Sequence, residues 1–158
     1  TQLVALAGGV RADLQATAAP ILAHLANALE MTAFLVVSDK QEAVTVQVVE
    51  PAHTAAHVAY RPGTRHPLEV GAPGIALLAG EDPLRGERQE VALARDRGWA
   101  YSEGEVIGGM ASIAAPVFAS DGTSKAALAV VHLALSLDSA IVAPPVTEAA
   151  KELGVALA

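Results

Sequence analysis

The sequence has no cysteine, few aromatic residues and no long apolar run, and each shortage excludes a class of protein. Without cysteine the chain cannot form disulfides, thiolate metal sites or a thiol nucleophile, and this composition fits the reducing cytoplasm. No apolar run approaches the roughly 20 residues of a membrane-spanning helix, and no signal-peptide pattern is present. Because aromatic residues make up only 3% of the chain, any cavity should be lined by small side chains.

Basic residues are also scarce. The chain has 10 Lys and Arg against 17 Asp and Glu, which gives a net charge of −7. A module that binds nucleic acid usually carries a basic stripe. The densest basic residues, Arg85, Arg88, Arg95 and Arg97, alternate with acidic ones, which predicts the solvated face of a helix. We therefore expect this chain not to bind DNA by itself.

Length and apolar content predict one domain, residues 1–158, with one packed core. The chain has 158 residues, of which 53% are apolar, and this is the usual size of a single domain. No repeat, low-complexity tract or internal linker interrupts it. It begins with Thr1 rather than Met, so we expect that an N-terminal portion precedes it in the full protein.

The N-terminal third predicts a helix and an antiparallel β-hairpin. A helical period runs from Val10 to Leu29, and Pro20 within it should kink or restart the helix. The apolar stripe of this helix could pack on its own sheet or meet a second subunit. Thr32–Ser38 predicts a buried strand, and Glu42–Glu50 predicts a half-exposed one because polar and apolar residues alternate. Its apolar face would consist of Val44, Val46 and Val48.

Residues Ala55–Tyr60 predict a third strand that ends in a turn at Arg61-Pro62-Gly63. His53 and His57 have a spacing that can hold a metal ion on a helix. Here they fall in a turn and a strand, where this spacing does not bring them together. We therefore expect no metal site and no cofactor.

A short apolar helix is predicted at Ile75–Ala79, after the segment Gly71-Ala72-Pro73-Gly74. Proline near its first turn and Gly80 just past its end are the usual asymmetry of helix ends. A buried helix N-terminus leaves free backbone N–H groups that need partners. An anion such as a ligand carboxylate could satisfy them, and so could water or neighbouring carbonyl groups.

The C-terminal half predicts a second helix, a hairpin and a last helix. The second helix should begin at Asp82-Pro83 and end at the C-cap Gly98. Asp121-Gly122 lies between strands Ser112–Phe118 and Lys125–Leu133, where this dipeptide favours a hairpin. The last helix should begin at Pro144-Pro145 and bury a face that contains Val146, Ala149, Ala150, Leu153 and Leu157. This element order predicts an α+β fold with one largely antiparallel sheet covered by helices.

Two motifs resemble a known family. Gly63-Thr64-Arg65-His66-Pro67-Leu68 followed by Gly74-Ile75-Ala76-Leu77-Leu78-Ala79 is similar to G-x-R-x-P-L-H-x-T-A-x-G-K-A-L-L-A. Arg97-Gly98-Trp99-Ala100 through Glu105, with Ser112-Ile113-Ala114-Ala115-Pro116-Val117, is similar to R-G-[YW]-A-x-S-x-x-E…S-I-A-A-P-V. Both motifs, in this order and at this separation, resemble the effector-binding domain of IclR-type bacterial transcriptional regulators. The resemblance covers nearly the whole chain.

The resemblance implies a GAF-like domain, with a curved antiparallel sheet flanked by helices and a small-molecule pocket. It also implies a preceding winged helix-turn-helix DNA-binding domain, dimers or tetramers, and effectors that are often small organic acids or aromatic compounds. The chain departs from the family pattern at three positions. Glu69 replaces the usual His, Gly71 the usual Thr, and Ile75 the usual Lys, so a cation beside the helix N-terminus is lost.

The family's ligand pocket can be carried over to ten residues of this chain. They lie on the predicted third strand, beyond its turn, at the N-terminus of the short helix, in the acidic turn and on the last two strands. These residues are Ala55, Val58, His66, Ala72, Pro73, Ser102, Met110, Ser112, Ala129 and Val131. The last two are often polar in relatives that bind small keto acids. Because they are apolar here, we expect an effector with a substantial apolar body.

Three polar side chains of this set have alternative interpretations. Ser102 and Ser112 could anchor a ligand by hydrogen bonds or cap local backbone groups. His66 could offer a hydrogen bond or a charge to an acidic effector, or it could face solvent. Glu105 matches the family's glutamate and is expected to order its turn, whereas Glu103 should be solvated.

Three functions are therefore weighed. The first is a ligand-sensing regulatory domain that couples effector binding to the oligomer and so to DNA-binding modules. The second is an oligomerisation module without a physiological ligand. The third, an enzyme using Glu105 or His66, is disfavoured because the sequence has no nucleophile signature such as G-x-S-x-G. The sequence identifies neither the effector, the target promoter, the direction of regulation nor the choice between dimer and tetramer.

Overall fold

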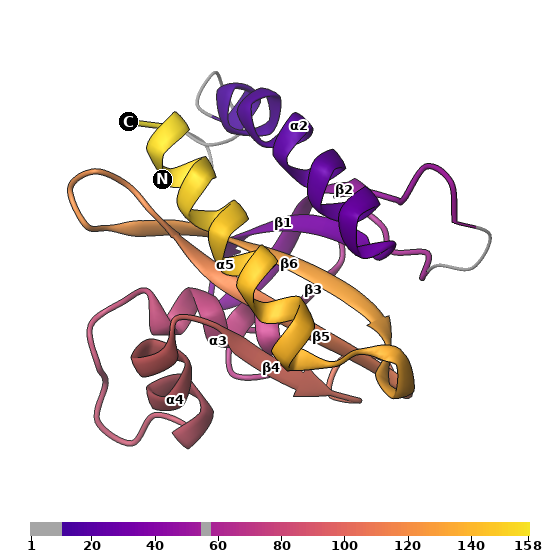
Figure 1. The fold of residues 1–158 in the computed structure, drawn as a ribbon. Helices are drawn as coiled ribbons and strands as arrows, with labels where there is room; N and C mark the ends of the chain where they lie inside the picture. Colours follow the sequence, from indigo (N-terminus) through magenta and orange to yellow (C-terminus); the bar gives the residue numbers. More distant parts are fainter. Residues whose placement is uncertain (1–10, 55–57) are drawn as a thin grey trace.

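The computed structural model describes residues 11–54 and 58–158, which form an antiparallel six-stranded sheet with helices on both faces (Figure 1). The strand order is β3-β2-β1-β6-β5-β4. The strands are β1 (Thr32–Asp39), β2 (Glu42–Val49), β3 (Arg65–Pro67), β4 (Ala100–Glu103), β5 (Met110–Phe118) and β6 (Ser124–Leu133). The helices are α2 (Arg11–Leu29), α3 (Ala72–Ala79), α4 (Gln89–Arg97), the 3₁₀ helix η2 (Ala134–Ser136) and α5 (Ser139–Ala156). The predicted α+β class is confirmed.

Each face of the sheet carries its own apolar core. Along β1 successive side chains point to opposite faces. Leu35 and Val37 join the core beneath α2 and α5, whereas Phe34 and Val36 join the core beneath α3 and α4. Figure 1 shows α2 and α5 side by side on one side of the sheet and α3 and α4 on the other. Both faces are therefore buried, which explains why β1 is apolar at almost every position.

Helix α2 packs on the sheet of its own chain. Its stripe of Leu14, Leu22 and Leu25 is buried in the core that α2 shares with α5. Pro20 lies inside this one helix on its exposed side. The Ala16 carbonyl, which has no N–H donor at Pro20, therefore lies on the side of the helix that faces water. The apolar stripe therefore packs on the sheet of its own chain, which was the first of the two interpretations.

A β-bulge changes the predicted face of β2. Leu35 pairs with Gln47 but Val36 pairs with Thr45, so Val46 is an extra residue without a partner on β1. A bulge moves the following side chains to the opposite face. Val46 therefore packs with α2 and α5, whereas Val48 packs with the core of α3 and α4. The prediction that the three valines share one face was wrong beyond the bulge.

Three further sequence predictions need correction. Residues 58–60 are not part of a strand, and Ala55 and His57 lie outside the described residues. Helix α4 begins at Gln89 rather than at Asp82-Pro83. Gly86 has a φ of 77° just before it, a left-handed conformation that does not continue a helix. Helix α4 ends at Gly98, which has a φ of 94°, as predicted.

The last helix, α5, begins before the two prolines. The Asp138 side chain accepts a hydrogen bond from the Ala140 N–H at 3.0 Å and so caps the helix at Ser139. Pro144 and Pro145 lie inside the helix. The predicted start was therefore wrong, and Leu157 is 39% exposed rather than buried.

Candidate functional site

The N-terminus of α3 is the structural centre of the candidate site. Gly71 precedes the helix with a φ of 86°, which disfavours any residue with a side chain. Pro73 lies in the first turn and Gly80 caps the end, as the sequence predicts. Nearly every residue of α3 is buried, so the free N–H groups of its first turn need partners inside the protein.

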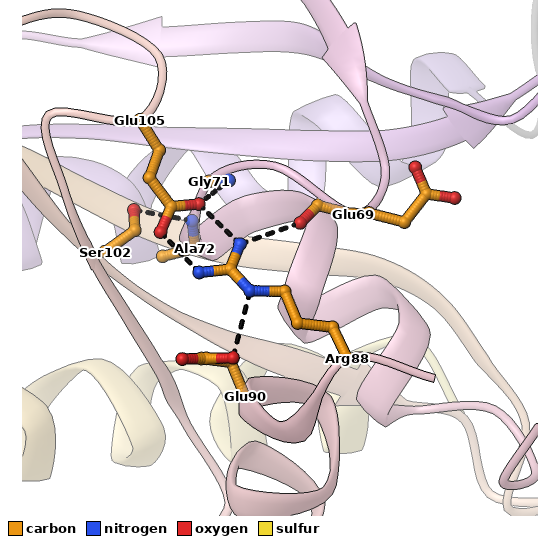
Figure 2. A network of polar contacts seen from close by, with 7 residues as sticks. All are labelled: Glu69, Gly71, Ala72, Arg88, Glu90, Ser102 and Glu105. Atoms are coloured by element: carbon orange, nitrogen blue, oxygen red, sulfur yellow. Dashed lines mark hydrogen bonds and ion pairs between the residues drawn. The ribbon is translucent and has the colours of Figure 1, made fainter. Parts of the chain in front are cut away.

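Side chains of this chain supply those partners. The Gly71 N–H donates to Glu105 Oε1 at 2.9 Å, and the Ala72 N–H donates to Ser102 Oγ at 2.7 Å. Figure 2 shows both acceptors converging on the start of α3. A carboxylate is stabilised here by the N–H groups and by the helix dipole. The Glu105 carboxylate and the Ser102 hydroxyl thus satisfy these N–H groups, and the binding of a ligand anion at this position stays a prediction.

Arg88 holds Glu105 in this position (Figure 2). Its Nη1 lies 2.7 Å from Glu105 Oε1 and its Nη2 lies 2.6 Å from Oε2, which is a bidentate pair. Arg88 also donates to the Glu69 carbonyl and to Glu90. The Arg88 guanidinium and, secondarily, the Gly71 N–H lower the pKa of Glu105 below its ordinary value. Arg88 was predicted to lie on a solvated helix face, and this was wrong because it precedes α4 and ties two loops together.

A small pocket opens beside these contacts. Its lining consists of Phe34, Tyr60, Pro73, Ser102, Glu105, Val106, Ile107, Met110, Ala111, Ser112 and Val131. The cavity volume is about 20 Å³, enough for about one water molecule and too small for an organic ligand. Any ligand larger than water therefore requires part of the wall to move.

The segment from Gly104 to Gly109, which we call the closing loop, forms the outer wall of the pocket. Gly104 and Gly109 have φ values of 68° and 80°, so both ends use conformations that glycine tolerates best. Val106 and Ile107 line the pocket from this loop, yet each is 39% exposed. The loop is held closed by the contacts of Glu105 with Gly71 and Arg88.

Two serines give the pocket a defined hydrogen-bonding pattern. Ser102 on β4 pairs directly with Ser112 on β5, so their side chains lie close together on one face. The Ser102 oxygen accepts the Ala72 N–H, which leaves its O–H free to donate. The Ser112 hydroxyl donates to the Val130 carbonyl at 2.8 Å, which leaves its oxygen free to accept. Both serines therefore contact backbone groups, as one interpretation holds, and each still presents one polar function, while their role as ligand anchors stays a prediction.

Five of the ten predicted ligand residues line this pocket. They are Pro73, Ser102, Met110, Ser112 and Val131. Ala72 contributes its N–H to Ser102, and Ala129 is fully buried in the core of that face. Val58 lies half-buried outside the lining, and its carbonyl accepts a hydrogen bond from Thr32. Ala55 lies outside the described residues, so its role stays a prediction.

His66 is buried rather than solvent-facing. It is 6% exposed, and its Nδ1 lies 3.0 Å from the Pro67 carbonyl oxygen. Its Nε2 has no hydrogen-bond partner among the residues that the structure describes. The imidazole lies against Gly71, because a Cβ built there would come within 3.3 Å of His66 Cε1. His66 therefore packs against Gly71, the residue before α3, and does not line the pocket.

Sequence reasoning missed six lining residues. Phe34 and Tyr60 form a ring contact with a centroid distance of 4.5 Å, and because β1 is apolar at almost every position, its sequence does not indicate that Phe34 faces α3. Val106 and Ile107 are an apolar pair between glycines, a pattern that could have marked a loop over a pocket. Ala111 carries no distinctive signal. Glu105 was expected to order its turn, and it does so through Gly71 and Arg88.

Within residues 11–54 and 58–158, no group of His, Asp or Glu side chains is arranged to hold a metal ion. None of the helices there combines the length and hydrophobicity needed to cross a membrane. The pocket itself offers one donor on Ser102 and one acceptor on Ser112, and the Glu105–Arg88 pair lies beside it at the helix N-terminus.

Comparisons with known proteins agree with this arrangement. Residues 9–88 and 86–155 match the family of the bacterial transcriptional regulator IclR C-terminal region. Among curated protein sequences, none matches. An IclR transcriptional regulator from Alicyclobacillus acidocaldarius has the same fold, with a TM-score of 0.82 and 21% identity, over 100% of this chain and 73% of that one.

Two further solved structures share the fold. The IclR protein of Thermotoga maritima has a TM-score of 0.77 and 19% identity, over 91% of this chain and 68% of that one. The repressor BlcR of Agobacterium tumefaciens has a TM-score of 0.77 and 22% identity, over 91% of this chain and 66% of that one. Because the family match covers most of the chain, this chain belongs to the IclR family of transcriptional regulators, as its C-terminal regulatory domain.

Proposed function

We propose that this domain senses a small organic acid with a sizeable apolar body, which binds in the pocket beneath the closing loop. The observation that carries the proposal is the helix N-terminus of α3, where Gly71 and Arg88 hold a carboxylate beside an apolar cavity. Glu105 supplies that carboxylate when the loop is closed. An effector carboxylate would take its place, with the ligand's apolar body against Phe34, Val131 and Met110.

Arg88 also provides a cation in place of the family's lysine. Ile75 stands at that lysine's position, and its side chain is fully buried among apolar residues. Arg88 brings a guanidinium to the same helix N-terminus from a different segment. A cation is therefore still present where an anionic effector would bind, which supports a preference for acids over neutral ligands.

The regulatory mechanism that we propose is linkage between ligand and oligomer. Displacement of Glu105 would release the closing loop together with Val106 and Ile107, which form part of the surface around the pocket. A surface that differs between the free and bound domain can favour one arrangement of a dimer or tetramer. In a cytoplasmic full-length regulator, residues 1–158 would form the effector domain, and a preceding winged helix-turn-helix domain would contact the DNA.

A panel of matched ligands tests this proposal. Phenylacetate and phenylacetamide have nearly the same shape, but only the first carries a charge. At about 100 times its Kd a ligand adds about 2.7 kcal/mol to the free energy of unfolding, which raises the Tm by about 5–10 °C for a domain of this size. We expect acids of this kind to raise the Tm and their amides not to do so.

Two variants make the test specific. Ser112→Val removes a polar group of the pocket and should reduce the Tm rise, whereas Ser120→Val, at an exposed position, should leave it unchanged. Tighter binding of pyruvate than of larger acids would contradict the apolar body. The cavity of about 20 Å³ favours one alternative, an oligomerisation module without ligand. A stable oligomer that no acid, amide or alcohol of the panel stabilises would support that alternative.

A further inference from the structure

A second, larger concavity lies on the opposite side of the sheet. It is a groove between residues 139–151 of α5, the turn that joins α4 to β4, and the C-terminal half of β5, with a volume of about 470 Å³. This volume is in the range of small-molecule sites. Trp99 contributes to its wall and packs against the core beneath α2 and α5, whereas the effector pocket lies in the core beneath α3 and α4. The two concavities are therefore separate.

An aromatic and cationic surface forms one wall of the groove. Helix α4 ends at Gly98 in a left-handed conformation, so the chain turns sharply between Arg97 and Trp99. The Arg97 guanidinium carbon lies 3.7 Å from the centre of the Trp99 ring, and its Nε donates to the Trp99 carbonyl at 2.8 Å. Phe118, which is 47% exposed, adds a second ring to the lining. Flat rings of this kind bind planar ligands well.

The charge of the groove is opposite to that of the chain. The chain has a net charge of −7, yet the lining contains Arg97 and Lys151 and no acidic residue. Arg65, Arg88 and Arg95 all pair with carboxylates. Arg97 and Lys151 form no ion pair with any residue that the structure describes. Consistent with this, burial without a carboxylate partner lowers the pKa of Arg97.

The first turn of α5 adds a hydrogen-bonding group. The Ser139 hydroxyl lines the groove and has no hydrogen-bond partner among the described residues. The positive end of the α5 dipole lies at this turn, where the Asp138 carboxylate already accepts the Ala140 N–H. The negative end of α4 lies at Gly98, and the charge of Arg97 offsets it.

We infer that this groove binds an organic anion that carries a flat aromatic ring. The ring lies between Trp99 and Phe118, and its negative group faces Lys151 and Arg97. This inference goes beyond the proposed effector function, because it requires neither Glu105 nor the closing loop. It gives the domain a second ligand site whose occupancy is independent of the first.

The only tryptophan of the chain provides a direct reporter. Incorporation of 5-fluorotryptophan places one ¹⁹F nucleus in the groove, at Trp99. Titration with benzoate should shift this resonance in a saturable manner. Benzyl alcohol has the ring without the charge, and acetate has the charge without the ring, so both should bind more weakly. A resonance that benzoate does not move, or that benzyl alcohol moves with equal affinity, would overturn the inference.

Charge variants locate the anion. Lys151→Gln should weaken benzoate binding by about twofold to fivefold, the effect expected of one exposed charge. Lys40→Gln removes an equal charge from the distant β1–β2 turn and should have no effect. Phe118→Ala alters an exposed ring, so the fold is retained, and it should also weaken binding. Equal affinity in the Lys151 and Lys40 variants would exclude the groove as the anion site.

A pocket variant separates this site from the effector pocket. Ser112→Val should change effector binding but leave the shift of the Trp99 resonance by benzoate unaltered. Loss of both responses in Ser112→Val would show that benzoate acts on Trp99 through the effector pocket, which would overturn the second site. A Tm rise with acids that is unchanged in Ser112→Val, together with an intact Trp99 response to benzoate, would instead contradict only the proposed effector function.

Discussion

Replacement of Glu105 by glutamine should loosen the closing loop and destabilise the domain. The glutamate carboxylate accepts the Gly71 N–H at 2.9 Å and two N–H groups of Arg88 at 2.7 and 2.6 Å. A glutamine retains one acceptor oxygen, which can still receive the Gly71 N–H. It loses the negative charge, and its NH₂ group would face a donor of Arg88.

The size of this effect follows from the exposure of the pair. A hydrogen bond to a charged group contributes about 1.5–3 kcal/mol when it is well shielded from water. The Arg88 and Glu105 side chains are 33% and 25% exposed, so solvent screening reduces this value. We expect Glu105→Gln to lower the free energy of unfolding at pH 7 by about 1–2 kcal/mol. Glu103→Gln is the matched control, because exposed Glu103 accepts only from the Tyr101 hydroxyl, and its effect should stay within about 0.5 kcal/mol.

The pKa shift of Glu105 predicts how this difference in stability changes with pH. The folded pKa of Glu105 is lowered, chiefly by Arg88. A carboxylate with a lowered folded pKa stabilises the protein fully above its unfolded pKa, about 4.3, and this contribution is lost as the pH falls through the folded value. The difference between the wild type and Glu105→Gln should therefore be largest near neutral pH and shrink under acidic conditions.

Urea denaturation between pH 3 and pH 8 measures these differences. Amide hydrogen exchange at Gly104 and Met110, whose N–H groups donate to the Met110 and Ile107 carbonyls, reports on the closing loop. Faster exchange in Glu105→Gln than in Glu103→Gln is the expected result. Two variants of equal stability with equal exchange at residues 104 and 110 would refute the role assigned to Glu105. A difference that increased toward acidic pH would refute the assigned direction of its pKa shift.

Two further predictions concern the walls of the pocket. Gly71→Ala should destabilise by about 1–3 kcal/mol more than Gly98→Ala in urea denaturation. Both glycines have positive φ values, but a Cβ at Gly71 would lie 2.6 Å from Val106 Cγ2, whereas one at Gly98 would meet nothing within 4 Å. Phe34→Ala should lower the free energy of unfolding by about 3–5 kcal/mol, because Phe34 is 1% exposed and contacts the Tyr60 ring; a loss below about 1 kcal/mol would contradict this packing.

Local sequence signals predicted most helices and strands, but neither the bulge in β2 nor the start of α5. Alternation predicted β2, yet it could not reveal the bulge opposite Leu35, which arises from the pairing of two strands. The pair Pro144-Pro145 resembled a helix start because proline favours the first turn. The actual start at Ser139 depends on the Asp138 cap, a weaker local signal that the two prolines obscured.

Half of the predicted pocket residues line the cavity because they lie on regular strands and at a helix end, where residue spacing determines the direction of the side chains. The polar network was less predictable. Glu105 contacts Arg88 and Gly71, which lie 17 and 34 residues away in sequence. No local pattern indicates such contacts, since they depend on how the loops before α3 and α4 meet the closing loop in space.

The same network implies a cost for effector binding under the proposed function. Because Glu105 and an effector carboxylate need the same N–H of Gly71 and the same guanidinium of Arg88, the closed loop and the bound acid exclude each other. If the closed contacts contribute about 1–2 kcal/mol, they weaken the apparent affinity by about 5-fold to 30-fold. Glu105→Gln should therefore bind an acid such as phenylacetate more tightly although the variant is less stable. A purely structural role of Glu105 would lower both stability and affinity, so isothermal titration of the variant distinguishes the two by the sign of the change.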